Sequence, residues 1–175
     1  MAFREIKATE IDGNFIKIIG QDWMLITAQD ENGRVNTMTA AWGSIGFAWR
    51  MPIAMCMVRR SRFTHRFIEC ADTFSLTFFD ESYRGQLNLC GKESGRDIDK
   101  IAACGFSVLH EGETPYFEQA RLVLICRKVA QKFFDADAFI DSDIIESAYP
   151  GPQRDFHDMY FGEIVKVLVK DVSQS

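Results

Sequence analysis

The sequence has 175 residues, of which 47% are hydrophobic and 15 are Phe, and its formal net charge is −5 at pH 7. A chain of this length can bury one sizeable core, so we expect a single domain over residues 1–175. The acidic balance argues against nucleic-acid binding, because affinity for a phosphate backbone comes from surplus Lys and Arg.

Signals for export, membrane insertion and metal binding are missing from the pattern. No N-terminal segment joins a basic start to an apolar core, and no apolar run approaches the ~20 residues that span a bilayer. We therefore expect a soluble, cytoplasmic protein that does not contact a membrane. The five cysteines include no Cys-x-x-Cys pair, which favours reduced thiols over disulfides or a metal site.

The first part of the chain predicts short antiparallel strands. Residues 15–19, in a mixed pattern, are expected as a short strand in a leader that packs across a barrel, and residues 23–28 as a second strand. Acids and an Asn-Gly pair in residues 30–34 are typical of a hairpin turn, so residues 35–41 should return antiparallel. Residues 44–51 are expected as a loop with large apolar side chains, and such loops often cover a ligand or a partner chain.

A continuous apolar run, Ile53 to Val58, follows Pro52 and ends abruptly in charge. It is too short for a typical helix and predicts a buried strand. Four arginines and His65 follow between Arg59 and Arg66 with no acid among them. This concentration suits an anion, although a solvated basic turn that balances nearby acids explains it equally well.

A helix is expected directly after this basic cluster. Ser61 or Thr64 can cap a helix that runs through residues 67–70, and the free N–H groups at its start would attract the same anion. Hydroxyls, guanidinium groups and a helix start at the end of a buried strand together predict a phosphate site.

The second half of the chain continues the β pattern with inserted helices. Residues 73–78 alternate apolar with small polar residues, which predicts a half-buried strand. Residues 82–91 predict a helix capped by Ser82 and ended by Gly91, and Asp97 is expected to start another short helix. The loop between them is either a polar contact to a ligand or an ordinary connector.

The C-terminal part predicts strands over residues 122–129 and 159–169, with Lys166 and Lys170 suggesting a partly exposed edge. Residues 144–149 resemble a short acidic helix inside a segment, 134–153, that has no assigned role. At least six strands with short helices and no regular βαβ alternation favour a mainly β fold, a closed or split antiparallel barrel.

Three segments in this order resemble one known family. They are Asn36-x-Met38-Thr39-x-x-Trp42 with Arg59-x-Ser61-x-x-Thr64, residues 88–100, and residues 157–164. Their order and spacing resemble the flavin reductase family of FMN-binding split-barrel proteins, close to its flavoredoxin-like branch. The resemblance implies an antiparallel Greek-key-type split barrel with short inserted helices, and a homodimer with flavin at or near the subunit interface.

The resemblance also implies which residues bind the cofactor, FMN or alternatively FAD. Charged and hydroxyl residues would hold the phosphate and ribityl region, namely Arg59, Ser61, Arg62 and Thr64. The ring would lie against Asn36, Met38, Thr39, Ala40, Ala41 and Trp42. The other side would be closed by Asn88, Leu89, Cys90, Gly91 and Lys92, with Ser94 and Arg96 as further polar contacts.

His157, the catalytic candidate, and Cys90 also have plainer interpretations. His157 is given a catalytic role near the nicotinamide or flavin edge, whereas a lone histidine is more often a hydrogen-bonded structural residue. Cys90 is interpreted as a packing residue rather than a redox thiol, because no partner cysteine is close in the sequence.

The function implied by the resemblance is an NAD(P)H:flavin oxidoreductase. NAD(P)H would reduce bound FMN, which then passes electrons to free flavin, a small acceptor or a partner protein. Since no Gly-x-Gly-x-x-Gly follows a strand, the nicotinamide would stack directly on the flavin. The alternatives are a flavoredoxin-type FMN electron carrier without NAD(P)H activity, a non-enzymatic flavin-binding module, and an oxidase of the pyridoxamine phosphate type.

Overall fold

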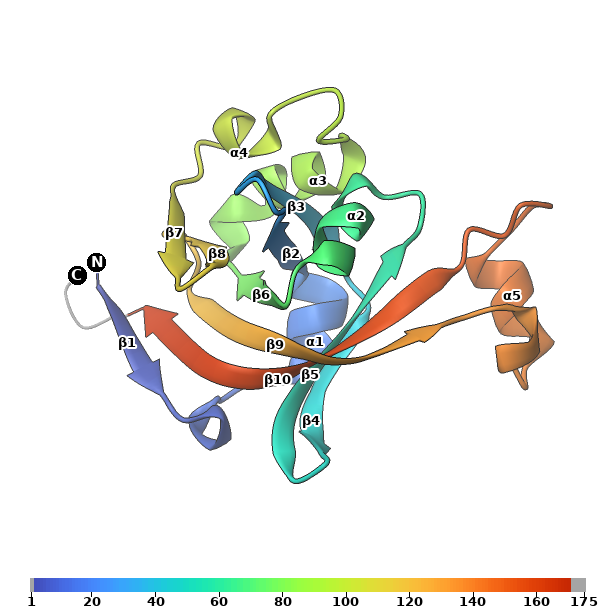
Figure 1. The fold of residues 1–175 in the computed structure, drawn as a ribbon, viewed down its shortest axis with the longest axis horizontal. Helices are drawn as coiled ribbons and strands as arrows, with labels where there is room; N and C mark the ends of the chain where they lie inside the picture. The colour runs from blue at the N-terminus through green and yellow to red at the C-terminus, as the bar shows by residue number, and fades with distance from the viewer. Residues whose placement is uncertain (1, 171–175) are drawn as a thin grey trace.

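The computed structural model describes residues 2–170, so Met1 and residues 171–175 of the predicted domain lie outside the described residues. An antiparallel sheet dominates it (Figure 1). The strand order is β3-β2-β6-β9-β10-β5-β4, and β1 adds to β10 outside this path. The strands are β1 (Phe3–Ile6), β2 (Met24–Gln29), β3 (Val35–Ala40), β4 (Gly43–Ala48), β5 (Met51–Arg59), β6 (Thr73–Phe78), β9 (Leu122–Phe133) and β10 (His157–Lys170).

Short helices and one small hairpin accompany this sheet. The hairpin pairs β7 (Val108–Glu111) with β8 (Thr114–Phe117). The α-helices are α1 (Phe15–Lys17), α2 (Phe63–Cys70), α3 (Arg84–Lys92), α4 (Lys100–Ala103) and α5 (Ser142–Ala148). A π-helical turn covers Ile18–Asp22, and 3-10 turns cover Ala8–Glu10, Glu81–Tyr83 and Ala136–Ala138. The mainly β prediction with short inserted helices is confirmed.

Two apolar clusters share the central strands. One gathers Phe74, Leu76 and Phe78 of β6 with Phe67 of α2, and the other packs beneath β8 and α3 around Phe117. Because elements cover both of its faces, β6 is buried rather than half-buried, and that prediction is wrong. Its small polar residues find partners inside the protein: the Ser75 hydroxyl donates to the Pro115 carbonyl at 2.6 Å.

Three local predictions are wrong for identifiable reasons. Residues 15–19 are helical because the Asn14 side chain accepts from the Lys17 N–H and starts a turn. Residues 44–51 are mostly strand rather than loop, since β4 pairs with β5 along its whole length. The closing strand β10 is central rather than an edge, because β5, β9 and β1 all pair with it.

The barrel is open along one seam. The terminal strands of the order, β3 and β4, are joined in the chain through Ala41 and Trp42, yet among residues 2–170 they do not pair with each other. Helices α2 and α3 pack over β3 next to this seam (Figure 1). A gap bordered by strand ends and helix ends is therefore built into the topology.

Candidate functional site

A cavity of about 250 Å³ lies at this seam, lined by residues of β3 and β5. Apolar side chains line about half of it, and two arginines and a histidine contribute to the rest. The lining residues are Met38, Thr39, Ala40, Ala41, Trp42, Met57, Arg59, Arg62, Gly91 and His157. Only Met57 of β5 was not among the predicted site residues. We call this the seam cavity.

A second cavity of about 150 Å³ adjoins it at Arg62, which borders both. It lies between the start of α2 and the loop after α3, and four of its lining residues are cations. The lining residues are Ser61, Arg62, Phe63, Thr64, Lys92, Glu93, Ser94, Gly95, Arg96 and Lys100. We call this the cationic cavity. Residues predicted to hold a phosphate therefore line a cavity that adjoins the one lined by residues predicted to contact the ring.

Lys100 is the most buried cation of the site. It is only 4% exposed, its ammonium donates to the Cys90 carbonyl at 3.1 Å, and burial lowers its pKa to about 8. Sequence reasoning missed this residue because its burial depends on how α4 packs beside α3. A buried lysine is costly unless a negative group compensates it.

Arg62 is half-buried where the two cavities meet. Its guanidinium donates to the Gly91 carbonyl at 2.5 Å, and burial together with the charge of Arg59 lowers its pKa. Within residues 2–170, neither Arg62 nor Lys100 forms an ion pair with a carboxylate. Two poorly compensated cations therefore face the same small space.

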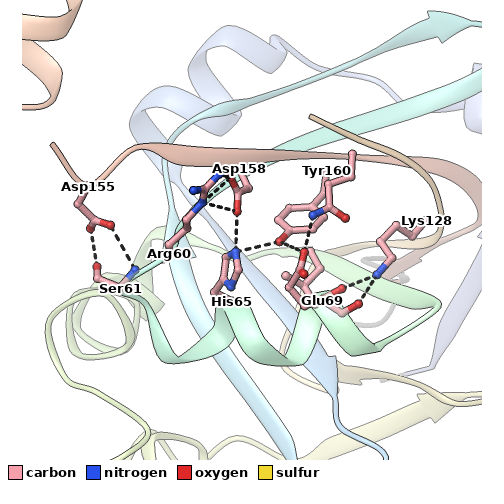
Figure 2. A network of polar contacts seen from close by, with 10 residues as sticks. Arg60, Ser61, His65, Glu69, Lys128, Asp155, Asp158 and Tyr160 are labelled. Carbon is pink, nitrogen blue, oxygen red and sulfur yellow. Dashed lines mark hydrogen bonds and ion pairs between the residues drawn. The ribbon is translucent and has the colours of Figure 1, made fainter. Parts of the chain in front are cut away.

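Three other residues of the basic segment are held by carboxylates of the protein itself (Figure 2). The fully buried Asp158 accepts from Arg60 at 2.8 Å and lies 2.7 Å from Nε2 of His65. The hydroxyl and backbone N–H of Ser61 donate to Asp155 at 2.5 and 3.2 Å. For Arg60, Ser61 and His65, the interpretation as a basic turn balanced by nearby acids is therefore correct.

Helix α2 begins without the predicted cap. Its N-cap is Arg62, and no side chain accepts a hydrogen bond from its first turn. The hydroxyl of Thr64 instead accepts from the buried Asn36 amide at 2.8 Å, which ties α2 to β3. In the first turn of α2, the N–H of His65 donates to the Arg62 carbonyl at 2.9 Å, while Phe63 and Thr64 line the cationic cavity. Free N–H groups at a helix start favour an anion.

Helix α3 forms the opposite wall of the seam cavity. Gly91 lies so close to β3 that a Cβ there would be 3.3 Å from Cβ of Thr39, whose hydroxyl donates to the Leu87 carbonyl at 2.5 Å. The helix runs through Gly91 to Lys92, and Tyr83 rather than Ser82 precedes it, so both predicted ends are wrong.

The remaining predicted residues of α3 line neither cavity. Asn88 is exposed and Leu89 is half-buried. Cys90 is buried, and its sulfur lies 3.6 Å from that of Cys104. Cys90 therefore does have a neighbouring cysteine in the folded protein, although none is close in the sequence.

His157 forms part of the polar end of the seam cavity. Its Nδ1 lies 2.9 Å from the Tyr149 hydroxyl, and its ring is 4.7 Å from that of Trp42. Burial, reinforced by the charge of Arg59, lowers its pKa to about 4. The imidazole is therefore neutral at physiological pH, so it can donate or accept a hydrogen bond without carrying charge.

The segment 134–153, which had no predicted role, supports this end of the site. The Arg59 guanidinium donates to the Ala148 carbonyl at 3.0 Å and lies 5.2 Å from the centre of the Tyr149 ring. Helix α5 therefore fixes Arg59 and His157, although most of it projects from the end of the β9–β10 pair (Figure 1).

Two other kinds of site are not found in residues 2–170. No group of three or more His, Cys, Asp and Glu side chains is arranged to hold a metal ion. In the same residues, no helix has both the length and the apolar character needed to cross a membrane.

Comparison with known proteins identifies the family of this chain. The flavin reductase like domain matches residues 17–175. The chain belongs to this family. No curated protein matches the sequence.

Several solved structures share the fold of this flavin reductase-like chain. A flavoredoxin from Methanosarcina acetivorans has a TM-score of 0.66 at 22% identity, covering 86% of this chain and 69% of its own. An FMN-binding protein from Thermus thermophilus has 0.68 at 20%, covering 97% and 83%. A Shewanella frigidimarina protein described as having a split barrel domain has 0.69 at 18%, covering 92% and 74%. The predicted split-barrel fold is confirmed.

Replacing His157 by Gln is expected to remove one pH-dependent contribution to stability. Its pKa is about 4 in the folded protein against 6.5 for an ordinary imidazole, so the unfolded chain binds a proton more readily between these values. This contribution is fully present above pH 6.5 and is lost as the pH falls toward 4. Urea denaturation should show the wild-type advantage over H157Q shrinking by about 2 kcal/mol across this range. A difference that does not vary with pH would contradict the assignment.

Proposed function

We propose that this chain, as a single flavin reductase-like domain, binds FMN across the seam and cationic cavities and acts as a flavin-dependent oxidoreductase. The observation that carries the proposal is the pair of cations, Arg62 and Lys100, set without carboxylate partners beside an apolar slot. A ligand with an anionic tail and a flat ring would compensate both charges and fill the slot.

The phosphate would lie in the cationic cavity. Arg62 and Lys100 would hold it, with Lys92, Ser94 and Arg96 around it, and the N–H groups of Phe63 and Thr64 at the start of α2 would add to the attraction. Arg96 is already oriented by its bond to the Ser61 carbonyl at 3.3 Å and by the Phe63 ring, 4.8 Å away. Ser61 would contribute only through this carbonyl, because Asp155 accepts from both its hydroxyl and its backbone N–H.

The ring would lie in the seam cavity. Met38 and Met57 supply polarisable apolar surface from β3 and β5, and Gly91 supplies close backbone approach from α3. The family membership supports a flavin as the ligand, and the similar Thermus thermophilus protein is described as FMN-binding. Bound flavin would supply the two-electron chemistry, so the chain needs no nucleophile of its own.

The remaining residues would orient the reacting partners. Trp42 is 42% exposed at the mouth of the seam cavity, and the neutral His157 lies behind it. A nicotinamide from NADH or NADPH would stack directly on the flavin ring, with the aromatic face of Trp42 beside it. Electrons would pass on to free flavin, a small acceptor or a partner protein.

A second copy of the chain would complete the pocket. The seam cavity, about 250 Å³, is smaller than the ~300–1,000 Å³ of typical ligand sites, and β4 of the β4–β5 hairpin starts directly after Trp42, one of its lining residues. This hairpin exposes Phe47 by 75% and Trp49 by 59%. Neighbouring exposed aromatic residues are typical of a surface that is covered by another chain. The homodimer implied by the family resemblance would cover both the hairpin and the cavity mouth.

Replacing Lys100 by Met is expected to weaken FMN binding about 10- to 100-fold, because one charge-assisted contact to the phosphate is lost. Binding of riboflavin, which has the same ring without the phosphate, should change little. Isothermal titration with FMN, FAD and riboflavin measures this. The control is Arg66→Ala. Arg66 is an exposed cation of the basic cluster between Arg59 and Arg66, and it lines neither cavity. Equal losses for FMN and riboflavin would contradict a phosphate role.

Anaerobic titration of the FMN-loaded protein with NADH and with NADPH is expected to bleach the visible flavin absorbance with at least one donor. Turnover with free FMN as acceptor should follow. If dithionite reduces the bound flavin but neither nicotinamide does, the flavoredoxin-type carrier replaces the reductase. Ligand binding without reduction by any donor would leave only a flavin-binding module.

Substitution of Phe47 by Glu is expected to convert a dimer into a monomer and to lower FMN affinity by about 10-fold, since burying the new charge is costly. Light scattering after size exclusion measures the mass. Leu109→Glu on the distant β7 strand is the matched control, as Leu109 is also an exposed apolar residue. A wild-type protein that is monomeric at micromolar concentration would refute the dimer.

A further inference from the structure

Cys90 and Cys104 form a thiol pair outside the proposed flavin contacts. Cys90 lies in α3 and Cys104 directly follows α4, and their sulfur atoms are 3.6 Å apart. A disulfide requires a sulfur separation of about 2.05 Å, so the side chains must approach by roughly 1.5 Å. The single turn of α4 is followed by Gly105 at φ +66°, so a flexible backbone position adjoins Cys104.

The two thiols differ in accessibility. Cys90 is fully buried, whereas Cys104 is half-buried at the edge of the second apolar cluster. Burial raises the pKa of Cys90 to about 12 and also raises that of Cys104, although the hydrogen bond with Cys90 opposes the shift of Cys104. Either sulfur can donate the hydrogen of this contact, and the S–H of Cys104 also donates to the Gln86 carbonyl at 3.6 Å. Cys104, as the more exposed of the two, is the sulfur that a dissolved reagent meets first.

We propose that Cys90 and Cys104 are a thiol–disulfide exchange site that a small disulfide oxidises to an intramolecular disulfide. The Cys104 thiolate attacks one sulfur of the small disulfide, which forms a mixed disulfide and releases one thiolate. Cys90 then loses its proton to solvent and attacks the Cys104 sulfur, and the second small thiolate leaves. Two protein thiols are oxidised to one disulfide, and one small disulfide is reduced to two thiols.

Oxidation would change how the cationic cavity is held. The bridge would close the segment from Cys90 to Cys104, which contains Lys100 and Gly91. In the reduced protein that segment is held by noncovalent contacts, such as the hydrogen bond from the Lys100 ammonium to the Cys90 carbonyl at 3.1 Å. A covalent link between α3 and α4 restricts this segment whether or not a flavin is bound.

The other cysteines provide internal controls. Cys70 is exposed, and its S–H donates to the Phe67 carbonyl at 3.4 Å. Cys56 and Cys126 are completely buried in the barrel core. A small disulfide should therefore leave a stable adduct on Cys70, leave Cys56 and Cys126 untouched, and leave no adduct on the Cys90–Cys104 pair.

The experiment treats the reduced full-length chain with excess oxidised glutathione, blocks remaining thiols with iodoacetamide, and maps peptides by mass spectrometry. We expect a peptide carrying Cys90 linked to one carrying Cys104, lighter by two hydrogen atoms than the separate pair. Dithiothreitol should reverse the link. Slower amide hydrogen exchange in residues 91–103 of the oxidised protein should accompany it.

Two variants separate the steps. C90S should trap a stable glutathione adduct on Cys104, whereas C104S should leave Cys90 reduced because the attacking thiol is missing. The proposal is overturned if wild-type Cys104 retains the adduct without a link to Cys90. It is equally overturned if both thiols remain reduced while Cys70 is fully modified, and this wild-type comparison does not depend on how either variant folds.

Discussion

β5 and β10 pair antiparallel so that Arg59 lies opposite His157 and Val58 opposite Asp158. This register decides which side chains face the seam cavity and which face away. It brings the neutral imidazole and the Arg59 guanidinium to the same end of the cavity, and it buries the Asp158 carboxylate next to Arg60 and His65. Because side chains alternate between the faces of a strand, a slip of one residue would exchange these roles. The division of the site into polar and apolar parts therefore follows from one strand pairing.

The same pairing sorts the basic cluster by charge compensation. Arg60 and His65 are satisfied by Asp158, so they contribute to folding rather than to a ligand. Arg62 and Lys100 are left on the other side, half-buried and buried, with only carbonyl partners. A protein with a formal net charge of −5 thus keeps a small space lined by four cations and a single acid. Local burial, rather than the overall charge, makes this space suited to one small anion.

Much of the fold was predictable because its signals are local. The hairpin turn at residues 30–34 and the apolar run of β5 identify strands without tertiary information, and most seam-cavity residues came from one family-like motif. The rest depends on distant contacts. Asp155 and Asp158 lie more than 90 positions from Ser61 and Arg60, so the sequence showed only uncompensated cations. The burial of Lys100 and the approach of Cys104 to Cys90 both require α4 to fold back against α3.

The seam itself has a cost for the chain that carries it. β3 and β4 end the strand order, so each presents one strand edge that pairs with no other strand among the described residues. Such edges can recruit strands from neighbouring molecules and so promote aggregation. Whatever fills or covers the seam would also protect these backbone groups. The tendency of the protein to aggregate therefore depends on the same seam of the barrel at which the seam cavity lies.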